Sequence, residues 1–372
     1  MGDRRPGQPG RTYALRMDWM DRGRGKRRRS TLLVSTLVVA LLVAVVALLP
    51  VPYVALSPGP TTDTLGSVDG KPLIEITGRK TYPARGHLNL TTVSVYGGPA
   101  QHLDLVTALR GWLDGATAVV PEEAVFPPGQ TAQQVEQVNV AQMDASQEDA
   151  TAAALKELDI QVEERVVVGS VVGGSPAEGK LEAGDAIFLV DGTPVEEPEQ
   201  VRDLVVKHRP GEDVRFLVRR GTEQKSVTVT TAEAPEEPGR AVVGILPRLG
   251  YTFPFEVDIG LEDVGGPSAG LMFALGITEK LTEEDLTDGR FIAGTGTIDD
   301  TGAVGPIGGI QQKLHAARDA GATVFLVPAD NCAQAVEGAP SGLRLVKVET
   351  LKVAVGALRA LASGGQVPAC AS

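Results

Sequence analysis

The apolar positions of the N-terminal region form one long uninterrupted run. Residues 30–55 carry no charged side chain, and an apolar stretch of this length is sufficient for one helix to cross a bilayer. Residues 1–29 hold ten Arg and Lys against three Asp, and clustered basic residues stay on the cytoplasmic side. The pattern predicts a basic cytoplasmic segment (1–29), a single transmembrane helix (30–55) and a cell-membrane protein whose remainder is extracytoplasmic. A cleaved signal peptide is less favoured, because its apolar core would be unusually long.

Residues 56–159 show weaker patterns and are predicted as an extracytoplasmic linker with strands. SPGPTTDTLGSVDGKP is rich in Pro, Gly and Thr and predicts a linker, whereas LIEI and HLNLTTVSVY predict strands. PEEAVFPPGQ predicts a loop, and SQEDATAAALKEL predicts a helix that begins near Ser146. We hypothesise that the strand in HLNLTTVSVY belongs to the sheet of the last domain, which would make the unit between them an insertion.

In residues 160–231, short segments that predict strands alternate with turns, and one segment predicts a helix. VVVGSVV, AIFLVDG, DVRFLVRRG and QKSVTVTT predict strands, and PEQVRDLVVKH predicts a helix with Val201 and Val205 on one face. On GSPAEGKLEAGDAIFLVDGTPV and the helix after it, this unit resembles a PDZ domain of bacterial proteases. The resemblance implies a groove that binds an extended peptide as an added strand. LDIQVEER, before VVVGSVV, shows no glycine-rich carboxylate-binding loop, so a packing domain without a ligand is the alternative.

The net charge, the histidines and the cysteines limit which partners and cofactors the chain is expected to have. The net charge is −12 for the whole chain and +7 for residues 1–29, so the remainder carries −12 − 7 = −19. An acidic body does not favour nucleic acid as a partner. GSPAEGK fits the first seven positions of a phosphate-binding loop, but Leu181 stands where Ser or Thr would hold magnesium. The histidines are scattered and the two cysteines, Cys332 and Cys370, form no CxxC motif, so no metal or cofactor is predicted. The sequence leaves open whether these cysteines pair.

One serine lies at the start of a very apolar segment, VGGPSAGLMFALG. Pro267 suits the first turn of a helix, so a helix is predicted to begin at about Gly266 or Pro267. Ser268 would then lie in that first turn, where unpaired backbone N–H groups can stabilise an oxyanion. Ser268 is therefore a candidate nucleophile. The alternative is that it caps a buried helix.

The best candidate base for Ser268 is a lysine. In GGIQQKLHAARDAGA, a helix from about Gly309 places Lys313 on the same stripe as Ile310 and Leu314, whereas His315 faces elsewhere. Burial disfavours the ammonium form, so a fall in the pKa of Lys313 from about 10.4 to near 7, worth ~4 kcal/mol, would leave an amine able to take the serine's proton. A snorkelling or ion-paired lysine is the alternative.

Residues from about 241 to 361 resemble the proteolytic domain of Lon proteases. The matching blocks are GGPSAG with Ser268, IAGTGTID, VGPIGGIQQKLHAARDAGA with Lys313, and FLVPADN. The resemblance implies that Ser268 is the nucleophile, that Lys313 is the general base and acid, and that Thr295 orients the lysine. The chain departs from the family where Val264 and Gly265 replace a Lys-Asp pair and Thr297 replaces a glutamate.

The predicted fold class is therefore multi-domain: a single N-terminal transmembrane helix, a PDZ-like β-rich domain (160–231), an α+β Lon-type proteolytic domain (240–362) and a C-terminal tail (363–372). No ATP-driven unfolding module is recognised. The combination implies an ATP-independent, membrane-anchored serine endopeptidase that cleaves unfolded or extended proteins, and Lon domains imply a homohexamer. A non-catalytic membrane adaptor that binds peptides through the PDZ-like groove is the alternative. Physiological substrate and groove ligand are not predicted.

Overall fold

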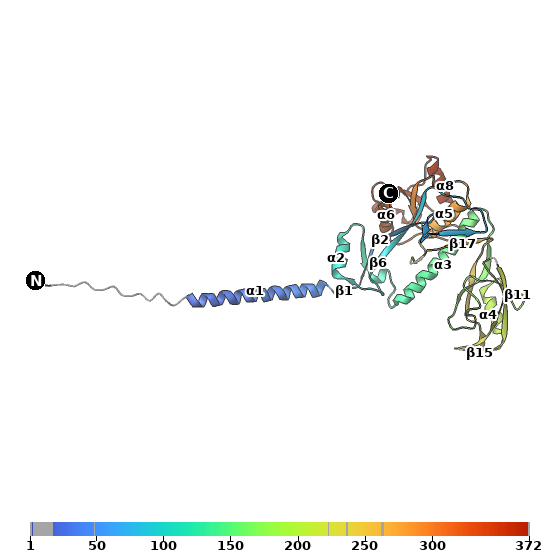
Figure 1. The fold of residues 1–372 in the computed structure, drawn as a ribbon, viewed down its shortest axis with the longest axis horizontal. Coiled ribbons are helices and arrows are strands. Elements are labelled where there is room, and N and C mark those ends of the chain that lie inside the picture. Colours follow the sequence, from blue (N-terminus) through green and yellow to red (C-terminus); the bar gives the residue numbers. More distant parts are fainter. Residues whose placement is uncertain are drawn as a thin grey trace.

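The computed structural model describes residue 2 and residues 18–47, 49–221, 223–235, 237–261 and 264–370. A long helix, α1 (Asp18–Ala47), leads into a body made of a larger unit and a smaller unit (Figure 1). The smaller unit comprises residues 163–252 and the larger unit the rest of residues 50–370. Most of the predicted basic segment 1–29, and residues 371–372 of the predicted tail, lie outside the described residues.

The structure of α1 contradicts the prediction of a transmembrane helix over residues 30–55. In the part of the chain that the structure describes, no helix is long and apolar enough to cross a membrane. The uncharged run 30–55 does not form one helix, because α1 ends at Ala47 and the next residues enter β1 (Pro50–Val51) and β2 (Tyr53–Asp63). This element of the predicted fold class is therefore wrong.

The larger unit is built around a six-stranded sheet with the order β22-β21-β18-β6-β2-β8. Strand β18 pairs in parallel with both β6 and β21, whereas β2 runs antiparallel to β6 and β8. The sheet thus joins strands that precede the smaller unit to strands that follow it (Figure 1). Besides β2, its strands are β6 (His87–Tyr96), β8 (Ala118–Pro121), β18 (Phe291–Gly294), β21 (Val324–Pro328) and β22 (Arg344–Val348).

The first part of the segment predicted as a linker belongs to strand β2 instead. The residues SPGPTTD form the second half of β2 and pair with β6, whereas β8 pairs only with residues 53–56 of the same strand. Proline cannot donate a hydrogen bond to a neighbouring strand, so prolines in sheets occur at edges or bulges. The register of β2 against β6 shifts between Pro58 and Thr61, and this irregularity accommodates both Pro58 and Pro60.

Helices cover both faces of the sheet of the larger unit. Side chains of one face, including Leu88, Leu90 and Leu326, pack in a core with α3 (Ala132–Glu157), α5 (Gly270–Leu281) and α8 (Leu351–Ala362). The alternate side chains Phe325 and Val327 pack on the other face with α6 (Ile310–Asp319) and α7 (Cys332–Glu337). Helix α2 (Leu105–Leu113) lies beside β8. This alternation follows from the two-residue period of strands.

Helix α3 is longer than the sequence predicted. It begins at Ala132 rather than near Ser146, and Thr131 and Gln134 form a capping box at its start. Because the first half of the helix, AQQVEQVNVAQMD, contains four Gln and few large apolar residues, its apolar periodicity is weak. Its C-terminal half is buried against α5.

The smaller unit contains a second sheet, with the strand order β13-β12-β10-β9-β16. Val201 and Val205 of α4 (Pro198–Val206) pack on its core with Val166 and Phe216. Strand β16, which we predicted as part of the domain 240–362, pairs along the whole of β9. The strands are β9 (Glu163–Val171), β10 (Ala186–Val190), β12 (Asp213–Arg220), β13 (Glu223–Thr230) and β16 (Ile245–Thr252), with β11 (Thr193–Pro194) beside β10 and a hairpin of β14 (Ala232–Ala234) and β15 (Glu237–Val242).

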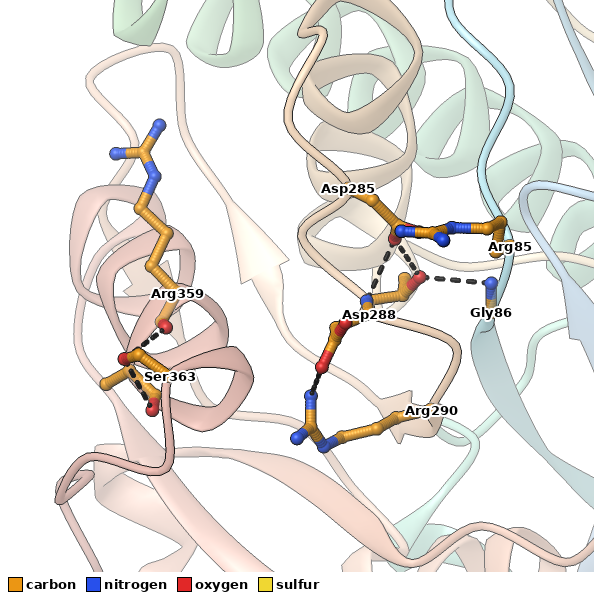
Figure 2. A network of polar contacts seen from close by, with 9 residues as sticks. Arg85, Gly86, Asp285, Asp288, Arg290, Arg359 and Ser363 are labelled. Carbon is orange, nitrogen blue, oxygen red and sulfur yellow. Dashed lines mark hydrogen bonds and ion pairs between the residues drawn. The ribbon is translucent and has the colours of Figure 1, made fainter.

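Two sets of polar contacts hold distant segments together. Between the units, Glu148 of α3 accepts hydrogen bonds from Arg248 Nη2 (2.5 Å) and from the backbone N–H of Tyr251 (2.9 Å) on β16. Within the larger unit, Asp285 accepts from Arg85 Nε at 2.8 Å, tying the loop between α5 and β18 to the start of β6 (Figure 2).

Short strand pairs and one disulfide complete the larger unit. Cys332 and Cys370 form a disulfide, which settles the pairing that the sequence left open and holds the end of the tail against α7. The backbone N–H of Lys347 also donates to Pro368 O at 3.0 Å. The short strands are β3 (Ser67–Val68), β4 (Lys71–Pro72), β5 (Ile74–Thr77), β7 (Leu103–Asp104), β17 (Glu256–Ile259), β19 (Thr297–Ile298) and β20 (Val304–Gly305).

Candidate active site

Ser268 lies in a turn directly before α5. The helix begins at Gly270 with Ala269 as its N-cap, which makes no side-chain capping bond, so the predicted helix start at Gly266 or Pro267 is wrong. Gly266 has φ +85°, a left-handed conformation that glycine adopts without strain and that excludes a helix there. Ser268 is therefore not a helix cap.

Lys313 comes from α6, on the opposite side of β18 from α5. Its Nζ donates to Ser268 Oγ at 2.8 Å and to Thr295 Oγ1 at 2.9 Å. Gly309, with φ +67°, forms the N-cap, and the helix starts at Ile310 as the sequence predicted. The structure thus brings all three predicted site residues together.

Thr295, just beyond the end of β18, links the lysine to the backbone of the serine. Its hydroxyl accepts from Lys313 and donates to the carbonyl oxygen of Ser268 at 2.9 Å. The same carbonyl accepts from the backbone N–H of Gly296 at 2.9 Å. Two donors therefore fix the position of Ser268 relative to the sheet, and the side chain of Thr295 is fully buried.

The surroundings of Lys313 favour the neutral form of its amine. The residue is only 2% exposed, and burial lowers its pKa from 10.5 to about 7. No carboxylate contributes to this pKa among the residues that the structure describes, so neither the snorkelling nor the ion-paired alternative describes Lys313. Near neutral pH a large fraction of the amine can accept a proton.

His315 is not part of this site. It lies on the half-buried side of α6, away from the stripe formed by Ile310, Lys313 and Leu314, as predicted. Gln312, on the same helix, is 5% exposed, and its Nε2 donates to Ala116 O at 3.3 Å.

Ser268 and Lys313 open into a cavity of about 490 Å³. Its walls come from segments far apart in the sequence, and among the lining residues that the structure describes Lys313 is the only charged one. No local motif marks the residues of β2, β6 and α3 as part of a site, because only the fold brings them to this cavity. The remaining lining residues are Pro60 of β2, residues 91–94 of β6, Met143 of α3, residues 264–266, Ala269 and Gly308.

The smaller unit has a groove of about 530 Å³ that is mainly apolar. One wall is α4, with Val201, Val205 and Val206, and the other includes residues 240–247. A carboxylate-binding loop of the PDZ resemblance is expected before β9, whereas the segment that lines the groove opposite α4 includes the turn between β15 and β16. The groove therefore uses a segment that follows the rest of the smaller unit in sequence.

Comparisons with known proteins agree with both units. Residues 259–355 match the Lon protease (S16) C-terminal proteolytic domain, and residues 141–231 match the PDZ domain. The chain is 31% identical over 136 residues to a Lon protease of Heliobacterium modesticaldum, covering 34% of this chain and 16% of the relative. It is 32% identical over 116 residues to Lon protease 2 of Bacillus subtilis, covering 30% and 20% respectively. The chain thus spans a fifth or less of these relatives.

A solved structure from Geobacillus thermodenitrificans is 33% identical and covers 22% of this chain and 93% of its own, with a TM-score of 0.20. Because this TM-score is low, we base no conclusion on it.

The family matches support a protein class, a serine peptidase with a Lon-type proteolytic domain and a PDZ domain, and the predicted enzyme class is confirmed.

Proposed function

We propose that this protein is an endopeptidase that uses Ser268 and Lys313 as a catalytic dyad. The observation that carries the proposal is the 2.8 Å contact between Lys313 Nζ and Ser268 Oγ inside a buried site. The neutral amine of Lys313 takes the proton of Ser268 as Oγ attacks the peptide carbonyl. The resulting ammonium then protonates the leaving amine as the C–N bond breaks, and water hydrolyses the acyl-enzyme by the same proton route.

The proposed substrates are unfolded or extended polypeptides, cleaved without ATP. Support comes from the position of Ser268 within a cavity between secondary-structure elements, which a folded surface cannot enter. The disulfide between Cys332 and Cys370 supports an oxidising compartment outside the cytoplasm. The proposed assembly is the homohexamer implied by the Lon resemblance, and analytical ultracentrifugation of the full chain measures it.

The test is cleavage of a permanently unfolded test protein by the full chain without ATP, across pH 5 to 9. Ser268→Ala and Lys313→Ala should abolish cleavage while keeping the parent's circular dichroism, and His315→Ala, on the same helix as the lysine, should retain it. The rate should rise with pH around a midpoint near 7, since burial lowers the pKa of Lys313 to about 7. Equal cleavage by all four proteins would remove the dyad from the mechanism.

A second proposed function is peptide binding by the groove of the smaller unit. The supporting observation is the apolar wall formed by Val201, Val205 and Val206 beside residues 240–247. Val205→Arg should abolish binding of fluorescent peptides with apolar C-termini, measured by anisotropy, and Val138→Arg, on the exposed part of α3, should leave it unchanged. Peptide binding by a parent that never cleaves would favour the non-catalytic adaptor.

A further inference from the structure

Helix α3 holds the two residues that precede the nucleophile. The hydroxyl of Ser146 donates to Pro267 O at 3.1 Å, and the backbone N–H of Gly266 donates to Asn139 O at 3.1 Å. Ser146 is 3% exposed. It lies outside residues 259–355 and inside residues 141–231, the match to the PDZ domain. The structure nevertheless packs this part of the chain against α5 of the larger unit.

The contact with Pro267 O acts on the peptide bond that leads into Ser268. A trans peptide is planar, and its C=O and N–H point in opposite directions; none of the described peptide bonds is cis. A donor that fixes Pro267 O therefore also fixes the direction of the Ser268 N–H. Among the residues that the structure describes, this N–H has no acceptor, so it remains available to an oxyanion formed beside Oγ.

Close packing keeps the Ser146 hydroxyl at this carbonyl. A Cβ built on Gly270 would lie 2.8 Å from Ser146 Oγ and 2.8 Å from Ile298 Cγ2. A Cβ built on Gly265 would lie 2.6 Å from Asn139 Cβ. Glycines at these two positions allow α3 to approach the segment around the nucleophile on both sides, and the hydroxyl has little space in which to rotate away.

We propose that Ser146 is a positioning residue for the nucleophile, which orients the Pro267–Ser268 peptide so that its N–H meets the oxyanion. The inference rests on the proposed peptidase function. Ser146 touches neither the substrate nor Lys313, so its effect is on the transition state through the backbone. Substrate affinity and the proton transfer to Lys313 should not depend on it.

The test compares Ser146→Ala, Ser146→Cys and Thr151→Val in the full chain. Ser146→Ala should lower kcat about 10- to 100-fold, less than or equal to the loss of one oxyanion donor, with KM and the midpoint of the pH profile unchanged. Ser146→Cys keeps a weak donor of similar shape and should recover part of kcat. Thr151→Val is the matched control, since Thr151 is also buried on α3 but donates to Gln147 O within the helix, and it should behave as the parent.

Two further measurements separate positioning from a general structural role. Affinity for a peptide boronic acid, which forms a tetrahedral adduct with serine, should fall in Ser146→Ala by the same factor as kcat. A crystal structure of Ser146→Ala should show the Pro267–Ser268 peptide turned from its position in the parent. An unchanged kcat, an equal loss in Thr151→Val, or an unturned peptide would overturn the inference. If the parent does not cleave, the proposed function fails, and the peptide orientation alone decides the role of Ser146.

Discussion

The buried amine of Lys313 should impose a pH dependence on folding that Lys313→Met removes. Burial lowers the pKa of Lys313 to about 7, whereas a lysine of the unfolded chain has a pKa of about 10.4. The unfolded state therefore binds more protons between these values, and stability rises with pH across this window. The cost of burying the ammonium is complete below pH 7 and disappears near pH 10.4. At 1.36 kcal/mol for each pKa unit, the full gain is about 5 kcal/mol, of which about 4 kcal/mol falls between about pH 6.5 and 10.5.

The assay is urea unfolding of the parent and of Lys313→Met at several pH values between about 6.5 and 10.5, at constant ionic strength. Methionine fills the same volume without a titrating group, and all other groups titrate alike in both proteins, so they cancel in the difference. The parent should gain about 4 kcal/mol relative to the variant as the pH rises. Lys347→Met, at a solvent-accessible lysine that pairs with Glu349, is the surface control. A difference between parent and Lys313→Met that stays constant with pH would refute a neutral buried amine.

Three more outcomes follow from the larger unit. Thr295→Val should lower kcat at least tenfold and move the pH midpoint below that of the parent, because the hydroxyl that accepts from the ammonium is lost; pH–rate profiles measure both. Burial raises the pKa of Glu279 to about 7, so the parent should lose stability from about pH 4.5 to 7 as the unfolded carboxyl ionises, and Glu279→Gln should lack this loss in urea titrations. Replacing both Cys332 and Cys370 by Ser should cost about 4 kcal/mol, since the bridge spans 38 residues; a reductant should destabilise only the parent.

The sequence predicts the site better than it predicts the fold around it. Ser268, Lys313 and Thr295 lie in short motifs, and the apolar stripe of α6 identifies the inward direction of Lys313 without any tertiary information. Strands with β-branched runs, such as β6 and β9, are recognised for the same local reason. These features depend on neighbours within a few residues, which a sequence displays directly.

Other elements depend on partners that are distant in sequence. Strand β2 contains Pro58 and Pro60, a composition typical of a linker, yet it forms a strand because it pairs with β6 along most of its length and with β8 at residues 53–56. The first half of α3 has no strong apolar stripe, so its start was missed. The uncharged run 30–55 was predicted as one helix from composition, whereas Pro50 and Pro52 direct its end into the body of the protein. The walls of the active-site cavity meet only through this topology.

The order of strands in the larger sheet has a consequence for how the chain is made. Strand β6 ends at Tyr96, and its parallel partner β18 begins at Phe291. A ribosome therefore completes the whole smaller unit while one edge of β6 has no partner. The smaller unit has its own core and is complete at Thr252, so it can fold first, as domains generally do during synthesis. Meanwhile the edge of β6 that later pairs with β18 stays unpaired, and an unpaired edge invites association with other chains. Because Lys313 and the strands from β18 onward are synthesised after the smaller unit, the proposed dyad of Ser268 and Lys313 cannot form before this part of the chain has been made.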